Sequence, residues 1–161
     1  MLFRSSASDS LTGNLLANLL QGGAGNDTLA GAGGNDTLAG GIGDDNLQGG
    51  DGIDTVTYAA SAAAVVVNLG LGTATGDGSD SLSSVEAIIG SALADQITGD
   101  ALANTLTGGA GNDTLDGGLG NDTLLGGLGN DLLVGGGGSD TVSYASSATA
   151  VNASQIGRAH V

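Results

Sequence analysis

Aspartate recurs at nine-residue intervals in two stretches of this chain, always within the same local sequence. The clearest units read Gly-Gly-x-Gly-x-Asp-x-Leu-x, as in residues 22–30 (GGAGNDTLA) and 117–125 (GGLGNDTLL). Asp carboxylates and the carbonyl oxygens of a glycine-rich backbone are ligands that Ca²⁺ accepts, about six to eight at a time and in flexible geometry. Mg²⁺ needs a tighter octahedron and keeps its water, and zinc and copper prefer Cys or His, which the repeat lacks. The repeat therefore predicts oxygen-lined calcium sites.

The candidate ligands occupy the sixth position of the units that match the repeat well. They are Asp27, Asp36, Asp45, Asp54, Asp113, Asp122, Asp131 and Asp140. Weaker units carry Asn18 or Asn104 at this position, or keep Asp9 or Asp95 without the neighbouring glycines, and we expect them to stack without a well-formed ion site. Asp80, between the two stretches, is a candidate for an extra ligand. The other acids are interpreted as solvated or structural charges: Asp44, Asp51, Asp77, Asp100, Asp116 and Glu86.

Each nine-residue unit is expected to form a six-residue turn followed by a three-residue strand. Glycine at the first, second and fourth positions permits backbone angles that side chains forbid. Alternate strand residues face opposite sides, so the eighth position, mostly Leu, points inward. Two units then make one coil of a stacked β-solenoid, and residues 18 apart lie over one another at about the 4.8 Å strand spacing. The predicted stacked pairs are Asp27 with Asp45, Asp36 with Asp54, Asp113 with Asp131, and Asp122 with Asp140.

The inward eighth positions predict the core of this all-β fold. They are Leu29, Leu38, Leu47, Val56, Ile97, Leu106, Leu115, Leu124, Leu133 and Val142. The two stretches are in register at a spacing of 86 residues, since Gly22 and Gly108 start equivalent units and Tyr58 and Tyr144 follow the two arrays. The chain thus reads as nearly two copies of one module. We interpret both tyrosines as apolar lids whose hydroxyls reach water, in preference to sugar-stacking platforms.

The predicted organisation has four parts. Residues 4–57 form a first repeat array, 58–89 a strand-rich insert, and 90–143 a second array, while 144–161 begin a further insert. Within the first insert, the β-branched run at 62–69 favours a strand, which 70–72 turn back through 73–75 as a hairpin.

The two ends of the chain differ from the repeat. Residues 1–5 and 156–161 resemble peptides translated from a sequencing adapter. Arg4 stands where the second copy has Gly90, and the match between the copies fails after Val151. We expect these ends to be non-native and the natural chain to be longer.

The repeat resembles the nonapeptide of the RTX, or haemolysin-type, calcium-binding proteins, over nearly the whole chain. The resemblance implies a parallel β-roll that holds Ca²⁺ in its turns. It also implies secretion by a one-step export machine, to the extracellular space or the cell surface. Such repeats are usually one part of a larger secreted protein, so other domains of a parent protein are expected partners.

The strongly negative charge of the chain argues against some classes of binding partner. Asp and Glu number 17 against 2 Lys and Arg, for a net charge of −15, which repels nucleic acid and anionic lipid. No apolar run approaches the roughly 18 residues of a membrane-inserted helix. The sequence offers neither a Ser–His pair nor an HExxH motif, because its one histidine, His160, lies in the segment interpreted as adapter-derived. We therefore expect no enzymatic activity.

Two functional hypotheses follow, with a third as a variant. The first is a calcium-binding module of a secreted protein, which folds when Ca²⁺ fills its turns outside the cell. The second is a structural spacer of a large repetitive surface adhesin, which the 86-residue spacing favours. The third is the C-terminal calcium module of a secreted hydrolase or toxin whose catalytic domain is absent.

Overall fold

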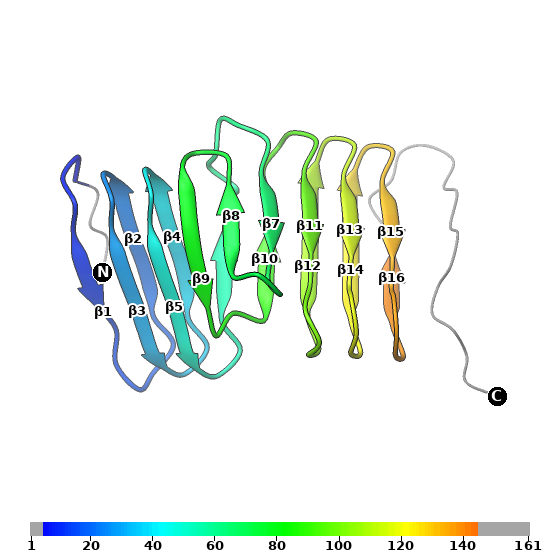
Figure 1. The fold of residues 1–161 in the computed structure, drawn as a ribbon, viewed down its shortest axis with the longest axis horizontal. Helices are drawn as coiled ribbons and strands as arrows, with labels where there is room; N and C mark the ends of the chain where they lie inside the picture. Colours follow the sequence, from blue (N-terminus) through cyan, green and yellow to red (C-terminus); the bar gives the residue numbers. More distant parts are fainter. Residues whose placement is uncertain (1–4, 145–161) are drawn as a thin grey trace.

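The computed structural model describes residues 5–144 and shows a β-solenoid built from two facing sheets (Figure 1). Every secondary-structure element within that range is a strand. Residues 5–144 accordingly contain no helix with the length and apolarity needed to cross a membrane. The proposed adapter-derived ends, apart from Ser5, and all of the predicted further insert except Tyr144 lie outside the described residues.

Along the chain the strands alternate between the two sheets, except that three consecutive strands of the insert all join the same sheet. The nine-stranded sheet has the order β1 (Ser10–Thr12), β3 (Thr28–Gly33), β5 (Asn46–Asp51), β9 (Ser79–Ser83), β8 (Thr73–Thr75), β7 (Val66–Asn68), β11 (Gln96–Thr98), β13 (Thr114–Asp116) and β15 (Leu132–Val134). The seven-stranded sheet has the order β16 (Thr141–Ser143), β14 (Thr123–Leu128), β12 (Thr105–Ala110), β10 (Ala87–Ile89), β6 (Thr55–Thr57), β4 (Thr37–Ile42) and β2 (Leu19–Ala24). Both sheets run the full length of the stack, as Figure 1 shows.

The register of the strands confirms the predicted coil of two units. Within each array, neighbouring strands are parallel and pair residues 18 apart, as Leu29 with Leu47 and Leu106 with Leu124. The parallel solenoid therefore follows from a nine-residue period in which every second unit returns to the same sheet.

The eighth-position side chains form the core, as predicted. Those from Leu29 to Leu133 are buried, and most are fully enclosed. Burying one such side chain stabilises a fold by about 1.5–3 kcal/mol. The insert extends the same core with Val65, Val67 and Ile88. Val142, in the last described strand, is only partly buried, because no described strand stacks beyond it.

The insert contains the predicted hairpin and keeps the stack continuous. β7 and β8 are antiparallel, although β7 covers only three of the eight residues expected at 62–69. β9 pairs antiparallel with β8 and parallel with β5, so the hairpin fills the nine-stranded sheet between the arrays. In the other sheet, β10 pairs parallel with both β6 and β12. The division of the chain into two arrays and two inserts remains a prediction.

The second-position glycines explain how the coils approach so closely. Gly41 has φ 108°, in the region that L side chains rarely adopt, and a Cβ built there would overlap the carbonyl oxygen of Gly23 in the neighbouring coil. Ala32 takes the same position in its unit with φ 83°, so one unit carries local strain.

Candidate metal centre

Two rows of sixth-position side chains run along the solenoid, one in the turns that lead into each sheet. The first row precedes the nine-stranded sheet and contains Asp9, Asp27, Asp45, Asp95, Asp113 and Asp131, together with Asp80, which lies within β9. The hairpin separates Asp80 from Asp95, whose Oδ1 accepts the N–H of Val65 at 2.8 Å. The second row precedes the seven-stranded sheet and contains Asn18, Asp36, Asp54, Glu86, Asn104, Asp122 and Asp140. A step is defined here as the contact between two turns that are neighbours in one row.

The predicted aspartate pairs are brought together, through one carboxylate oxygen. The backbone N–H of Asp27 donates to Oδ1 of Asp45 at 2.8 Å. The same bond joins each of the other three pairs, at 2.8 to 3.0 Å. Each carboxylate thus secures the preceding coil of its own row.

The second carboxylate oxygen, Oδ2, has no such partner. In all eight candidate ligands Oδ2 is buried and makes no hydrogen bond. Leaving a buried acceptor unsatisfied costs about 1–3 kcal/mol, and more when the group is charged. An ion coordinated by Oδ2 would remove this cost, and all eight positions chosen from the repeat share the feature.

The first-position glycine shapes the space in front of Oδ2. A Cβ built on Gly22 would overlap Oδ2 of Asp27 and lie 2.7 Å from the carbonyl oxygen of Gly40, in the next turn of the row. A carboxylate oxygen and a backbone carbonyl from successive coils therefore converge on one spot that a side chain would fill. Within residues 5–144, no three or more His, Cys, Asp or Glu side chains gather into a metal site. Backbone carbonyls must then complete any coordination shell, which suits Ca²⁺.

The weaker units satisfy their sixth-position oxygens locally. Oδ2 of Asp95 accepts the backbone N–H of Ser91 at 2.6 Å, and its Oδ1 accepts the Ser91 hydroxyl at 2.7 Å. Asn18 and Asn104 each accept the N–H of the second residue of their own unit. These contacts occupy oxygens that an ion would otherwise coordinate, and the poorer ion sites of these units remain a prediction. Asp9 differs, because its Oδ2 is buried and unpartnered like those of the eight candidates.

Asp80 has both of its oxygens engaged. Oδ1 accepts the N–H of Asp45 at 3.0 Å, and Oδ2 accepts the hydroxyl of Tyr58 at 2.9 Å. Asp80 thus serves as the stacking partner of Asp45 and lacks the free oxygen of the other candidates. Tyr58 is 6 % exposed, which excludes a sugar-stacking platform and corrects the expectation that its hydroxyl reaches water.

Two features of the turns escaped the sequence analysis. The fifth position forms a ladder of its own, in which Asn26 Oδ1 accepts the N–H of Asp44 at 3.1 Å and Asp44 Oδ1 accepts that of Ser79 at 2.9 Å. The recurrence of Asn at this position was the available signal. The second missed feature is the role of Glu86, whose Oε2 accepts the N–H of Asp54 at 2.9 Å, as a sixth-position Asp does. It follows Asp54 by 32 residues, so the 18-residue spacing concealed it.

Burial and like charges oppose ionisation of the rows. The pKa of Asp45 and of Asp113 is raised to about 6, chiefly by burial and also by neighbouring carboxylates, although a backbone hydrogen bond lowers it. Burial likewise raises the pKa of Asp54 and of Asp122, each with a contribution from its partner in the row. A cation between the coils would favour the ionised forms.

Comparison with known families agrees with the geometry. The family model described as RTX calcium-binding nonapeptide repeat (4 copies) matches residues 5–38, 12–47, 39–57, 89–124 and 120–146. The matches leave out residues 58–88, nearly all of the predicted insert. No curated protein matches the chain. Because the family model covers more than half of the sequence, the chain belongs to the RTX family of calcium-binding nonapeptide repeats.

Proposed function

We propose that the eight sixth-position aspartates are the calcium ligands of this repeat module. They are Asp27, Asp36, Asp45, Asp54, Asp113, Asp122, Asp131 and Asp140. The observation that carries this proposal is the buried, unpartnered Oδ2 that all eight share. Oδ1 of each residue holds the preceding coil, while Oδ2 and backbone carbonyls face the ion. The same carboxylate then couples ion binding to coil stacking.

The proposed activity is a folding switch in a secreted protein. With a net charge of −15, the chain repels itself when no cation is bound, so it stays loose where calcium is scarce. Extracellular calcium modules bind their ion with a Kd of about 10⁻⁴–10⁻³ M. A site that forms only in the folded state stabilises that state by about 2.7 kcal/mol when calcium is 100-fold above Kd. Several such sites fold the chain after it leaves the cell, through a one-step export machine.

A second candidate is a structural spacer in a large surface adhesin. The 86-residue super-repeat supports it, as do the two copies stacked end to end with both sheets continuous between them. A third candidate is the C-terminal module of a secreted hydrolase or toxin. The parent reading frame distinguishes them: further copies of the 86-residue module identify a spacer, whereas an adjoining catalytic domain identifies an enzyme or toxin. In each case we expect no catalytic activity from this module.

Calorimetric titration of the chelator-treated chain tests the ligand assignment. Ca²⁺ should bind saturably, and Mg²⁺ more weakly, because the sites rely on many oxygens in flexible geometry. Equal binding of both ions, or no binding of Ca²⁺, would refute the proposal.

A further inference from the structure

A complete step of either row has a recognisable geometry. The unpartnered Oδ2 of one turn and the first-position carbonyl of the next turn lie against the same glycine Cα. This holds where the glycine is Gly22, Gly31, Gly108 or Gly117, and the carbonyl belongs to Gly40, Gly49, Gly126 or Gly135. All four steps join turns of the regular nine-residue repeat.

The same geometry recurs where the second row crosses the insert. The position of a Cβ on Gly49 lies 2.5 Å from Oδ2 of Asp54 and overlaps the carbonyl oxygen of Ser84. Asp54 is fully buried and its Oδ2 has no hydrogen-bond partner. Ser84 thus stands where the other steps have the first-position glycine of the next turn.

Glu86 takes the sixth position of this irregular turn. Its Oε2 accepts the N–H of Asp54 at 2.9 Å, as Oδ1 of Asp54 accepts that of Asp36 at 2.8 Å. β10 begins directly after Glu86, in register with β6. Ser83 is in register with Gln48 and Ala87 with Thr55, so three residues, 84–86, stand where the preceding coil has six, 49–54. The side chain of Glu is one methylene longer than that of Asp, which gives the carboxylate extra reach in a shortened turn.

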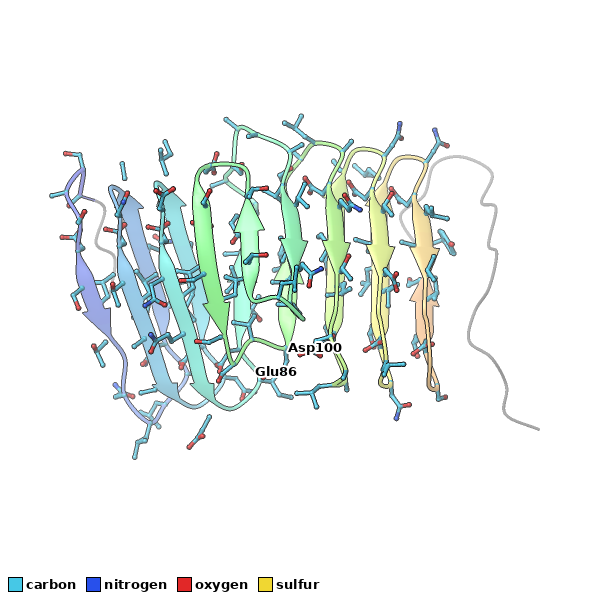
Figure 2. The ribbon with its side chains drawn as sticks, viewed as in Figure 1. Glu86 and Asp100 are labelled. Carbon is cyan, nitrogen blue, oxygen red and sulfur yellow. The ribbon has the colours of Figure 1, made fainter. Side chains whose placement is uncertain are left out.

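The short turn leaves a notch between the two arrays. Its volume is about 320 Å³, and its walls include Gly50, Ser84, Glu86 and Asp100. Figure 2 shows Glu86 and Asp100 near one another at this edge of the solenoid. Asp100 Oδ1 accepts the N–H of Leu102 at 2.7 Å and so stabilises its own turn. The notch gives solvent a route to Glu86.

The first row crosses the insert differently. There the stacking partner of Asp45 is Asp80, whose second oxygen accepts the Tyr58 hydroxyl. A neutral donor satisfies that carboxylate without an ion. Oδ2 of Asp45 is itself buried and unpartnered, but the carboxylate stacked on Asp45 is bonded to Tyr58. In the second row the unpartnered Asp54 Oδ2 lies beside the Ser84 carbonyl, so the two rows are unequal at the insert.

We infer that Asp54 Oδ2, the Ser84 carbonyl and the Glu86 carboxylate form a further calcium site, which joins the first array to the insert. The inference rests on the proposed calcium-binding function and adds a ligand, Glu86, that lies outside the nonapeptide phase. An ion there ties the coil of β6 to the coil of β10. The second row then continues as an ion-binding series into the insert, while the first row is closed by Tyr58.

Calcium counting in variants of the full chain tests this site. Glu86→Gln keeps an oxygen that accepts the Asp54 N–H but removes the charge, so the variant should bind one Ca²⁺ fewer than the unmodified chain. Asp100→Asn makes the same charge change in the same notch and should leave the number of bound ions unchanged. A Glu86→Gln variant that binds the full number, or an equal loss in Asp100→Asn, overturns the inference. If the unmodified chain binds no calcium, the proposed function fails instead.

A crystal structure of the unmodified chain with calcium provides a test that does not depend on a variant folding. Anomalous scattering should place an ion about 2.3–2.6 Å from Asp54 Oδ2 and the Ser84 carbonyl oxygen. An ion at the Asp27 step without one at the Asp54 step would overturn the inference and remove Asp54 from the proposed ligands, while calcium binding by the regular repeat steps would stand.

Discussion

In the proposed sites, a sixth-position carboxylate uses one oxygen for structure and the other for ion binding. Oδ1 of Asp36 accepts the N–H of Asn18 at 2.7 Å, whereas Oδ2 is buried without a partner. In the unit that contains Asp95, Ser91 replaces the second glycine and donates to both oxygens. The glycines therefore matter twice, because they permit the turn and because they leave the carboxylate unsatisfied. A lone Asp in a turn lacks this second property.

Replacing Asp36 by Asn tests the division at a single residue. The amide oxygen still accepts the Asn18 N–H, but the charge that faces the ion is lost. We expect the calcium affinity of that step to fall by about tenfold or more, or about 1.4 kcal/mol per factor of ten. Calorimetric titration measures the change. The control is Asp51→Asn, an exposed acid outside the sixth position, and an equal loss in that variant would count against the assignment.

Without calcium the stability of the fold should fall as the pH rises, whereas the affinity for calcium should rise over the same interval. Burial raises the pKa of Asp45 and Asp113 from 3.8 to about 6, so the folded chain holds these protons more tightly than the unfolded chain. Their contribution to the stability of the ion-free fold is greatest below about pH 4 and is lost as the pH rises through about 6. Calcium needs the ionised carboxylates, so its affinity should rise over the same interval.

Circular dichroism of calcium-free protein checks the first half of this prediction, and calcium titrations at pH 5 and pH 7 check the second. The β signal should decline with rising pH in the absence of calcium, and binding should be tighter at pH 7. An ion-free β signal that grows with pH would be inconsistent with carboxyls whose burial favours the protonated form.

At the scale of the turn and strand, the constant nine-residue phase made the fold predictable. It placed Leu29 in the core over Leu47 and Asp27 beside Asp45, as the structure shows. The insert breaks that phase, since the strand register sets its three residues 84–86 against the six residues 49–54 of the preceding coil. Glu86 was therefore interpreted as a merely structural charge. The hydrogen bond from Tyr58 to Asp80 could not be predicted from the sequence either, because the repeat does not relate these two residues.

Substituting a second-position glycine should weaken the stack directly. Gly41→Ala places a Cβ against the Gly23 carbonyl of the adjacent coil at φ 108°, so we expect a loss of about 1–3 kcal/mol in the free energy of unfolding. Urea denaturation in saturating calcium measures it. Gly70→Ala is the matched control, since the nearest atom to its Cβ would be 3.4 Å away, and should change stability little. Similar losses in both variants would show that coil spacing is not the cause.

At the scale of the whole molecule, a small core and a large negative charge oppose one another. The core is one cluster of apolar side chains that the two sheets enclose, and the chain carries a net charge of −15. The same bound cations would neutralise part of that charge and link neighbouring coils. Because each coil contacts only its neighbours, ions distributed along both rows are expected to stabilise the entire stack.

The most direct test of this account is far-UV circular dichroism of the chain in millimolar calcium and again after addition of excess chelator. We predict a β-sheet spectrum with calcium that collapses toward an unfolded spectrum when the ion is removed, and that returns when calcium is restored. A β-sheet spectrum of equal intensity in both conditions at neutral pH would contradict the claim that buried aspartates in neighbouring coils need a shared cation.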